Sequence, residues 1–170
     1  MGYVHDTHMS QFFSALNCQF TAGTWTPTIS DHIASMVRGA ADASFTVLIP
    51  INLPGNASAF KGIKIKTIDV FYAIGTAAAD DFPTVQLEKM TLGANDTTIS
   101  GQAVTISLDA AHDAAVERLA ADDDHMMTIT ITTPEWSDND LAYVLQLVVD
   151  CAATTVFTLF GVRVNYDLRV

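Results

Sequence analysis

The densest group of residues whose types could do chemistry is Asp122-Asp123-Asp124-His125. Calcium and other hard cations bind several carboxylate and carbonyl oxygens that converge from one loop. Three consecutive acids on an extended chain diverge, and this cluster lacks the Asp-x-Asp-x-Asp-Gly spacing of an EF-hand loop. The sequence therefore favours a solvated acidic loop over a metal site, with Asp122, Asp123, Asp124 and His125 as weak candidate ligands.

Catalytic patterns are not found in the chain. Zinc needs three or four converging nitrogen or sulfur ligands, and the sequence has no Cys-x-x-Cys or His-Glu-x-x-His motif beside His112-Asp113 and Glu117. A metal-dependent enzyme would require His112, His125 and the acids Asp122 to Asp124 to converge on one ion. No Gly-x-Ser-x-Gly elbow or glycine-rich phosphate loop is present, and turn chemistry explains most of the aspartates. We therefore expect no enzyme and no cofactor.

The aromatic residues suggest a different chemistry, because exposed aromatic rings stack on sugars. Tyr72, Tyr143 and Tyr166 lie in phase with apolar neighbours, which is typical of core positions. Trp136, in the loop 133–137, is the aromatic best placed for exposure and is a weak candidate ligand-binding residue. The alternative is a tryptophan that packs over the open end of the fold.

The elements that must position these residues are strands. In Phe45 to Leu53 every odd position is apolar, and in Phe160 to Leu168 every even position is apolar. Side chains on a strand point to opposite faces in turn, so both patterns predict half-buried strands. Short strands between turn-forming clusters predict an all-β antiparallel sandwich with jelly-roll topology. The expected strands, about eight or nine in number, are 12–20, 25–29, 44–53, 63–74, 84–91, 103–108, 126–133, 141–149 and 156–168.

Three local features refine this prediction. The apolar phase is odd from Ile63 to Ile65 and even from Ile68 to Ile74, so we expect a bulge near Lys66-Thr67. Pro50 cannot donate to a ladder, which places it at a sheet edge or a bulge. The segment 141–149 is apolar on nearly both faces and predicts a central strand, covered within the sandwich or by a neighbouring subunit.

The segment 109–121 is the one helix candidate. Asp109 could cap its N-terminus, and Val116 and Leu119 could form a narrow apolar stripe. A long loop with one helical turn is the alternative.

The composition indicates burial in an assembly. The net charge is -11 and the pI about 4.5, which argues against a nucleic-acid partner. Hydrophobic residues make up 49% of the chain and charged residues only 16%, against roughly 25% charged in an average soluble chain. No run reaches the roughly 18 apolar residues of a membrane helix, and the N-terminal residues do not resemble a secretory signal. We expect neither a membrane partner nor export.

The domain organisation is expected to be simple. Residues 1–11 are polar and unpatterned and predict an N-terminal arm, and 12–170 predict a single jelly-roll domain. Cys18 falls in phase with Phe12, Leu16 and Phe20, so we expect it to face inward. Cys18 and Cys151 are either two buried thiols or a disulfide.

Four segments carry a resemblance to a known family: Val47 to Pro54, Lys61 to Tyr72, Thr130 to Pro134 and Phe160 to Tyr166. Together they resemble small jelly-roll structural proteins of tailed bacteriophage particles, such as capsid decoration (cement) proteins and head-fibre modules. The resemblance implies a homotrimer at the virion surface whose partner is the major capsid protein or another virion protein.

Two functions follow from these observations. The first is a non-enzymatic capsid decoration protein that stabilises a phage head through multivalent contact. The alternative is a lectin-like β-sandwich module that binds carbohydrate through loop aromatics such as Trp136.

Overall fold

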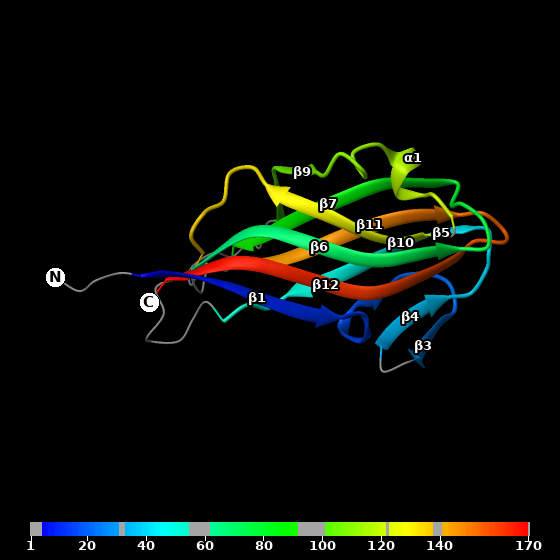
Figure 1. The fold of residues 1–170 in the computed structure, drawn as a ribbon, viewed down its shortest axis with the longest axis horizontal. Coiled ribbons are helices and arrows are strands. Elements are labelled where there is room, and N and C mark those ends of the chain that lie inside the picture. The colour runs from blue at the N-terminus through cyan, green and yellow to red at the C-terminus, as the bar shows by residue number, and fades with distance from the viewer. Residues whose placement is uncertain are drawn as a thin grey trace.

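The computed structural model describes residues 5–30, 33–54, 62–91, 101–121, 123–137 and 141–169, with the backbone alone at position 123. In these ranges the chain forms two antiparallel sheets that pack face to face (Figure 1). The first sheet contains β1 (Asp6–Ser14), β3 (Trp25–Ser30), β4 (Ile33–Arg38), β6 (Ile63–Gly75), β9 (Ile106–Leu108), β10 (Asp123–Ile131) and β12 (Val156–Arg169). The second contains β2 (Gln19–Phe20), β5 (Ala43–Ile51), β7 (Asp81–Thr91), β8 (Gly101–Val104) and β11 (Leu141–Cys151).

The strand order is that of a jelly roll. The first sheet contains the order β4-β12-β6-β10, and the second contains β5-β11-β7-β8. Numbered along the chain, these eight strands lie in the orders 1-8-3-6 and 2-7-4-5, which is the jelly-roll arrangement. The predicted fold class is therefore confirmed, and β1, β2, β3 and β9 extend the edges of the eight-stranded frame.

The core forms where the period-two patterns predicted it. Along β5 the odd positions from Phe45 to Ile51 are buried, and along β12 the predicted even positions are buried from Val162 to Leu168. Phe160 is the exception, because it lies outside the core and Leu159 is buried instead. The buried side chains meet between the two sheets and form one continuous hydrophobic cluster.

The predicted bulge in β6 is present. Thr67 pairs with Asn165 and Ile65 pairs with Tyr166, so Lys66 is the extra residue without a partner on β12. The bulge lets both halves of β6 send their apolar side chains into the core. Pro50 lies opposite Val144 of β11, beyond the short stretch of β5 that β2 covers, so it occupies a sheet edge among the described residues.

The predicted central strand is β11, which lies between β5 and β7. Its odd positions point into the core, while Val144, Gln146 and Val148 on the other face are half-buried. Within the described part of the chain, no further layer covers this outer face.

The structure differs from expectation at the N-terminal end. The segment 12–20 is not one strand, because a 3-10 turn at Ala15–Asn17 carries the chain from β1 in the first sheet to β2 in the second. The turn breaks the alternation, so Phe12 and Leu16 are exposed instead of inward-facing. The segment predicted to be an arm forms most of β1 from Asp6 onward, paired with β12; residues 1–4 lie outside the described ranges.

One further strand was not expected. β4 escaped prediction because Ile33–Arg38 shows no clean alternation and ends in a buried arginine. Of the two alternatives for the segment 109–121, the structure shows the long loop with a single helical turn, α1 (Ala115–Arg118). No helix in the described part of the chain has the length and apolar character needed to cross a bilayer.

Candidate functional site

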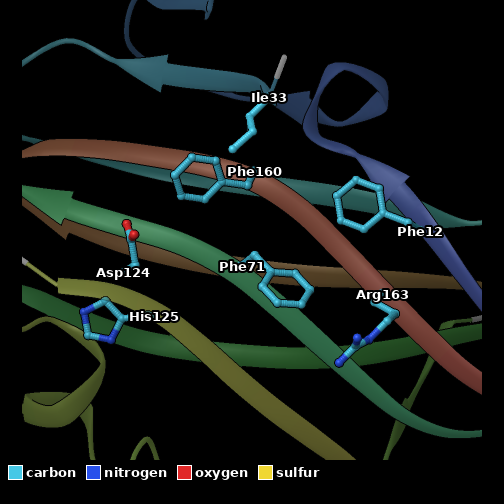
Figure 2. A pocket seen from close by; sticks show the side chains of 7 residues that line it. All are labelled: Phe12, Ile33, Phe71, Asp124, His125, Phe160 and Arg163. Atoms are coloured by element: carbon cyan, nitrogen blue, oxygen red, sulfur yellow. The ribbon is translucent and has the colours of Figure 1, made fainter. Parts of the chain in front are cut away.

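A shallow apolar groove lies on the outer face of the first sheet (Figure 2). Its volume is about 360 Å³. The residues that line it come from β1, β4, β6, β10 and β12: Phe12, Ile33, Phe71, Asp124, His125, Phe160 and Arg163.

Strand register and a second bulge bring the three phenylalanines together. Phe71 pairs with Gly161, and the next pair is Tyr72 with Leu159, so Phe160 is the extra residue of a bulge in β12. Phe12 lies opposite Arg163, and its ring centroid is 6.3 Å from that of Phe71.

Gly161 lets β1 approach this bulge closely. Its φ is 145°, a conformation that L side chains rarely adopt. A Cβ at this position would overlap the Phe13 carbonyl oxygen and the Phe12 ring. A glycine is therefore required where β1 covers the edge of β12.

The groove and its surroundings leave large apolar side chains in solvent. Phe12 is 56% exposed and Ile33 55%, and Met126, which pairs with Phe71, is 51% exposed. Single exposed apolar residues are ordinary, but a contiguous group of this kind marks a binding surface.

A fixed polar group borders the phenylalanines. Arg163 donates from Nε and Nη2 to Asp69 Oδ2 at 2.9 and 2.8 Å, and its guanidinium carbon lies 5.6 Å from the centre of the Phe71 ring. Asn165 donates to the same oxygen at 3.1 Å, and Thr128 Oγ1 donates to Oδ1 at 3.0 Å. This network holds Arg163 in one orientation at the edge of the groove.

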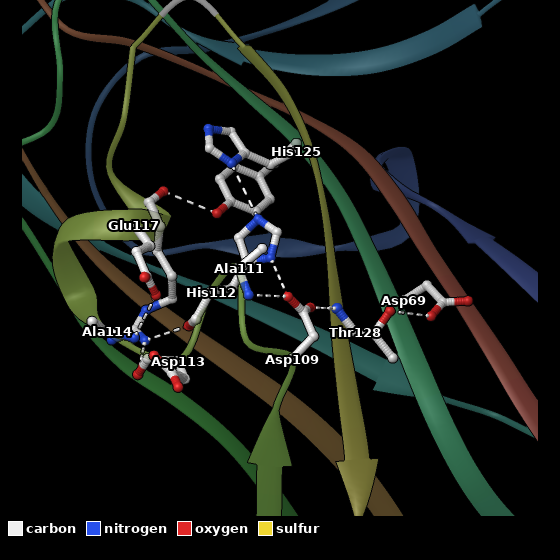
Figure 3. Close-up of polar contacts among 11 residues, drawn as sticks. Asp69, Asp109, Ala111, His112, Asp113, Ala114, Glu117, His125 and Thr128 are labelled. Carbon is white, nitrogen blue, oxygen red and sulfur yellow. Dashed lines mark hydrogen bonds and ion pairs between the residues drawn. The ribbon is translucent and has the colours of Figure 1, made fainter.

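A second polar cluster lies on the inner side of β10, where the loop 109–121 returns to the sheet (Figure 3). His112 Nδ1 is 2.8 Å from Asp109 Oδ1, and His112 Nε2 is 3.3 Å from His125 Nδ1. The His125 ring is stacked on Tyr72 with centroids 4.6 Å apart. Arg118 fixes the loop by donating to the carbonyl oxygens of Phe82, His112 and Asp113.

Burial and hydrogen bonds shift the pKa of Asp109 in opposite directions. Burial alone would raise the pKa of this carboxyl group, but hydrogen bonds from the Thr128 amide, the His112 ring and the Ala111 amide outweigh it. The pKa of Asp109 is therefore below its ordinary value, and the group is ionised at neutral pH.

The weak metal candidates do not form a metal site in the described part of the chain. Asp122 is outside the described residues, and of Asp123 only the backbone is described. Asp124 and His125 both border the groove, but as neighbours on one strand their side chains leave β10 on opposite faces, and the His125 ring stacks on Tyr72. No three His, Cys, Asp or Glu side chains in the described ranges are grouped so that they could hold a metal ion.

Trp136 is half-buried and covered by cations. The Arg169 guanidinium lies 3.7 Å from the ring centre and Lys64 Nζ lies 4.5 Å from it. Trp136 is not among the residues that line the groove.

Neither cysteine is an activated nucleophile. Both thiols are free. Burial raises the pKa of Cys18 to about 12 and also raises the pKa of Cys151. Both therefore remain protonated at neutral pH.

Sequence reasoning missed the phenylalanines of the groove. Phe71 does carry a signal, because it occupies the polar phase of the strand between Val70 and Tyr72. Phe12 gave the wrong signal, because in the sequence it falls in phase with Leu16 and Phe20. The 3-10 turn at Ala15–Asn17, which separates these residues in the structure, cannot be seen in the apolar pattern.

Comparison with known proteins identifies no family. No protein-family model matches the chain, and no curated protein matches it. One similar solved structure belongs to a study of the promiscuous specificity of carbohydrate-binding modules from the β-sandwich superfamily, with 12% identity and a TM-score of 0.43 over 92% of this chain and 55% of that one. Another is a family two carbohydrate esterase from Cellvibrio japonicus, with 7% identity and a TM-score of 0.39 over 98% of this chain and 36% of that one. This chain thus spans about half the length of the first of these structures and about a third of the length of the second. Both scores are too low to support an inference about function, and the fold class stands on the strand order.

Proposed function

We propose that this protein is a non-enzymatic structural protein that works by assembly, as a homotrimeric decoration protein on the capsid of a phage head. The observation that carries the proposal is the apolar groove on the outer face of the first sheet, with Phe12 and Ile33 at its rim. Its occupant in the proposal is a second copy of this chain, because an interface between subunits would bury the side chains that one subunit leaves in water.

Two other features support assembly. The outer face of β11 leaves Val144 and Val148 half-buried beside the uncharged Gln146, and it offers a second surface for contacts. Only 16% of the residues are charged, which fits a chain whose surface is shared with neighbours. The capsid partner and the trimer come from the resemblance to jelly-roll virion proteins.

Carbohydrate binding in the same groove is the second candidate function. The observation that favours it is the pairing of apolar rings with the fixed Arg163–Asp69 group, since sugars are bound by aromatic stacking together with planar hydrogen-bonding side chains. The aromatic platform in this version is Phe12 and Phe71, and Trp136 has no part in it.

The test compares variants by sedimentation velocity. Phe12→Ser and Ile33→Ser each place a hydroxyl in the groove. Each is expected to raise the dissociation constant of the oligomer at least tenfold. Val116→Ser is the matched control, because Val116 is 68% exposed on α1. Equal oligomerisation in all four proteins would refute the groove as the interface. Co-sedimentation with capsids of the matching major capsid protein tests the partner, and a glycan array on wild type and Phe12→Ser tests the second candidate.

A further inference from the structure

A second pocket lies where β1, β12 and β6 run side by side (Figure 1). Its volume is about 360 Å³, and small-molecule sites typically measure roughly 300–1,000 Å³. The polar part of its lining is His8, Ser10, Lys66, Asn165 and Asp167, and no residue lines both this pocket and the apolar groove. The pocket is therefore separate from the proposed interface.

Strand register brings these polar side chains together. Across β1 and β12, Ser10 pairs with Asn165 and His8 pairs with Asp167. Residues two apart on a strand share a face, so the four side chains lie on one face of the sheet. Lys66 is the extra residue of the β6 bulge, and its side chain is exposed beside them. The bulge thus directs a cation to this pocket.

The charges on these three strands leave one cation without a partner. Each carboxylate of β1, β6 and β12 is paired: Asp6 with Arg169, Asp69 with Arg163, and Asp167 with both Lys64 and His8. Lys66 makes no hydrogen bond or ion pair with any residue that the structure describes. The chain as a whole has a net charge of -11, so this pocket is a local site for one negative charge.

Two uncharged groups of the pocket can also bind a ligand. Asn165 Nδ2 donates to Thr67 Oγ1 at 3.0 Å and to Asp69 Oδ2 at 3.1 Å. Both amide hydrogens are thereby used, which fixes the side chain and leaves its Oδ1 as an acceptor. The exposed Ser10 hydroxyl has no hydrogen bond within the described part of the chain, and it can donate or accept.

We propose that this pocket binds a small hydroxylated carboxylate, of which a uronic acid is the simplest example. The ligand carboxylate pairs with the Lys66 ammonium group and accepts a hydrogen bond from Ser10, and a ligand hydroxyl donates to Asn165 Oδ1. One negative charge fits better than two, because a single cation is unpaired and the Asp167 carboxylate lies in the same pocket. A phosphate monoester, with a charge of about -1.5 to -2, is therefore a poorer ligand.

The test is a titration of the ¹⁵N-labelled full chain with sodium galacturonate at neutral pH and constant ionic strength, followed by amide NMR spectra. We expect saturable shifts at the amides of 8–10 on β1 and 165–167 on β12. Galactose lacks the carboxylate and acetate lacks the hydroxyls, so each should bind at least tenfold more weakly. Tighter binding of trigalacturonate than of galacturonate would assign the ligand to an acidic polysaccharide, and equal binding would assign it to a free acidic sugar.

Lys66→Gln should weaken galacturonate binding at least tenfold, and its exposed position makes it compatible with the fold. Lys89→Gln is the matched control, because Lys89 lies on the other sheet and is already paired with Glu135. Its affinity should equal that of wild type.

Three results would overturn the proposal: no saturable shift with galacturonate, equal affinity for galactose or acetate, or unchanged affinity in Lys66→Gln. Shifts confined to the amides of Phe71 and Phe160 would place the sugar in the groove and would also overturn it. The proposed assembly is measured separately by sedimentation, so the failure of one proposal leaves the other standing.

Discussion

Arg118 is a buried charged side chain on α1, and its partners are backbone carbonyls. It is 6% exposed and donates twice to the Phe82 oxygen and once each to those of His112 and Asp113. The guanidinium thus replaces backbone hydrogen bonds that an irregular loop does not make for itself.

Arg118→Met should therefore lower the free energy of unfolding by about 3 kcal/mol, because the carbonyls would remain buried without a donor. Urea unfolding followed by circular dichroism measures the loss. Lys89→Met is the control, because its ion pair with Glu135 is partly exposed, and it should cost less than about 1 kcal/mol. Equal losses in the two variants would contradict the role assigned to Arg118.

Acid should destabilise the protein through Asp109 and Asp167. Burial alone would raise the pKa of Asp167, but hydrogen bonds from His8 and Lys64 lower it. The hydrogen bonds to Asp109 lower the pKa of that carboxyl group in the same way. A carboxyl group with a lowered pKa stabilises the fold above its unfolded pKa of about 3.9, and this contribution is lost as the pH falls through the folded pKa.

The urea midpoint should therefore hold steady from pH 7 to about pH 5 and fall steeply below about pH 4. The fall should be shallower in Asp109→Asn, which lacks one of the two carboxyl groups. A midpoint that is independent of pH, or a slope unchanged in the variant, would show that Asp109 is not the responsible group.

At the scale of elements, β1 depends on the backbone of Gly161. Gly161→Ala should push β1 away from β12, since the added methyl group meets the Phe13 carbonyl and the Phe12 ring. Hydrogen exchange should show faster exchange for the β1 amides and for their partners in β12. Gly75→Ala is the control, because a Cβ on Gly75 would have no other atom within 4 Å. Unchanged exchange in Gly161→Ala would mean that β1 is held by other contacts.

The long strands could be predicted from the sequence, because a half-buried strand alternates apolar and polar residues. β5 followed the pattern, as did β12 from Val162 onward, and even the bulge at Lys66 was visible as a change of phase. The bulge at Phe160 was not, because Gly161 beside it restores the apparent alternation. The expected strand 103–108 proved to be β8 and β9, which join different sheets on either side of Thr105.

The candidate site was less predictable than the fold. The phenylalanines of the groove come from three strands, and only the sheet order brings β1, β6 and β12 side by side. His112 and His125 were visible as residues, but their contact depends on a loop path that the buried Arg118 fixes through the His112 carbonyl. Contacts between segments distant in the chain have no local signature in the alternation.

At the scale of the whole molecule, the groove and the outer face of β11 lie on opposite sheets. A subunit with two such surfaces can contact two neighbours at once, as the proposed trimer requires. The central claim is that the chain works as an assembly whose interface includes Phe12 and Ile33.

Light scattering of the purified wild-type chain, with and without EDTA, tests this claim most directly. We predict the mass of a trimer that does not change with chelator, because the proposed interface is built from apolar side chains such as Phe12 and Ile33. A monomer at micromolar concentration, or an oligomer that dissociates when EDTA is added, would contradict the account.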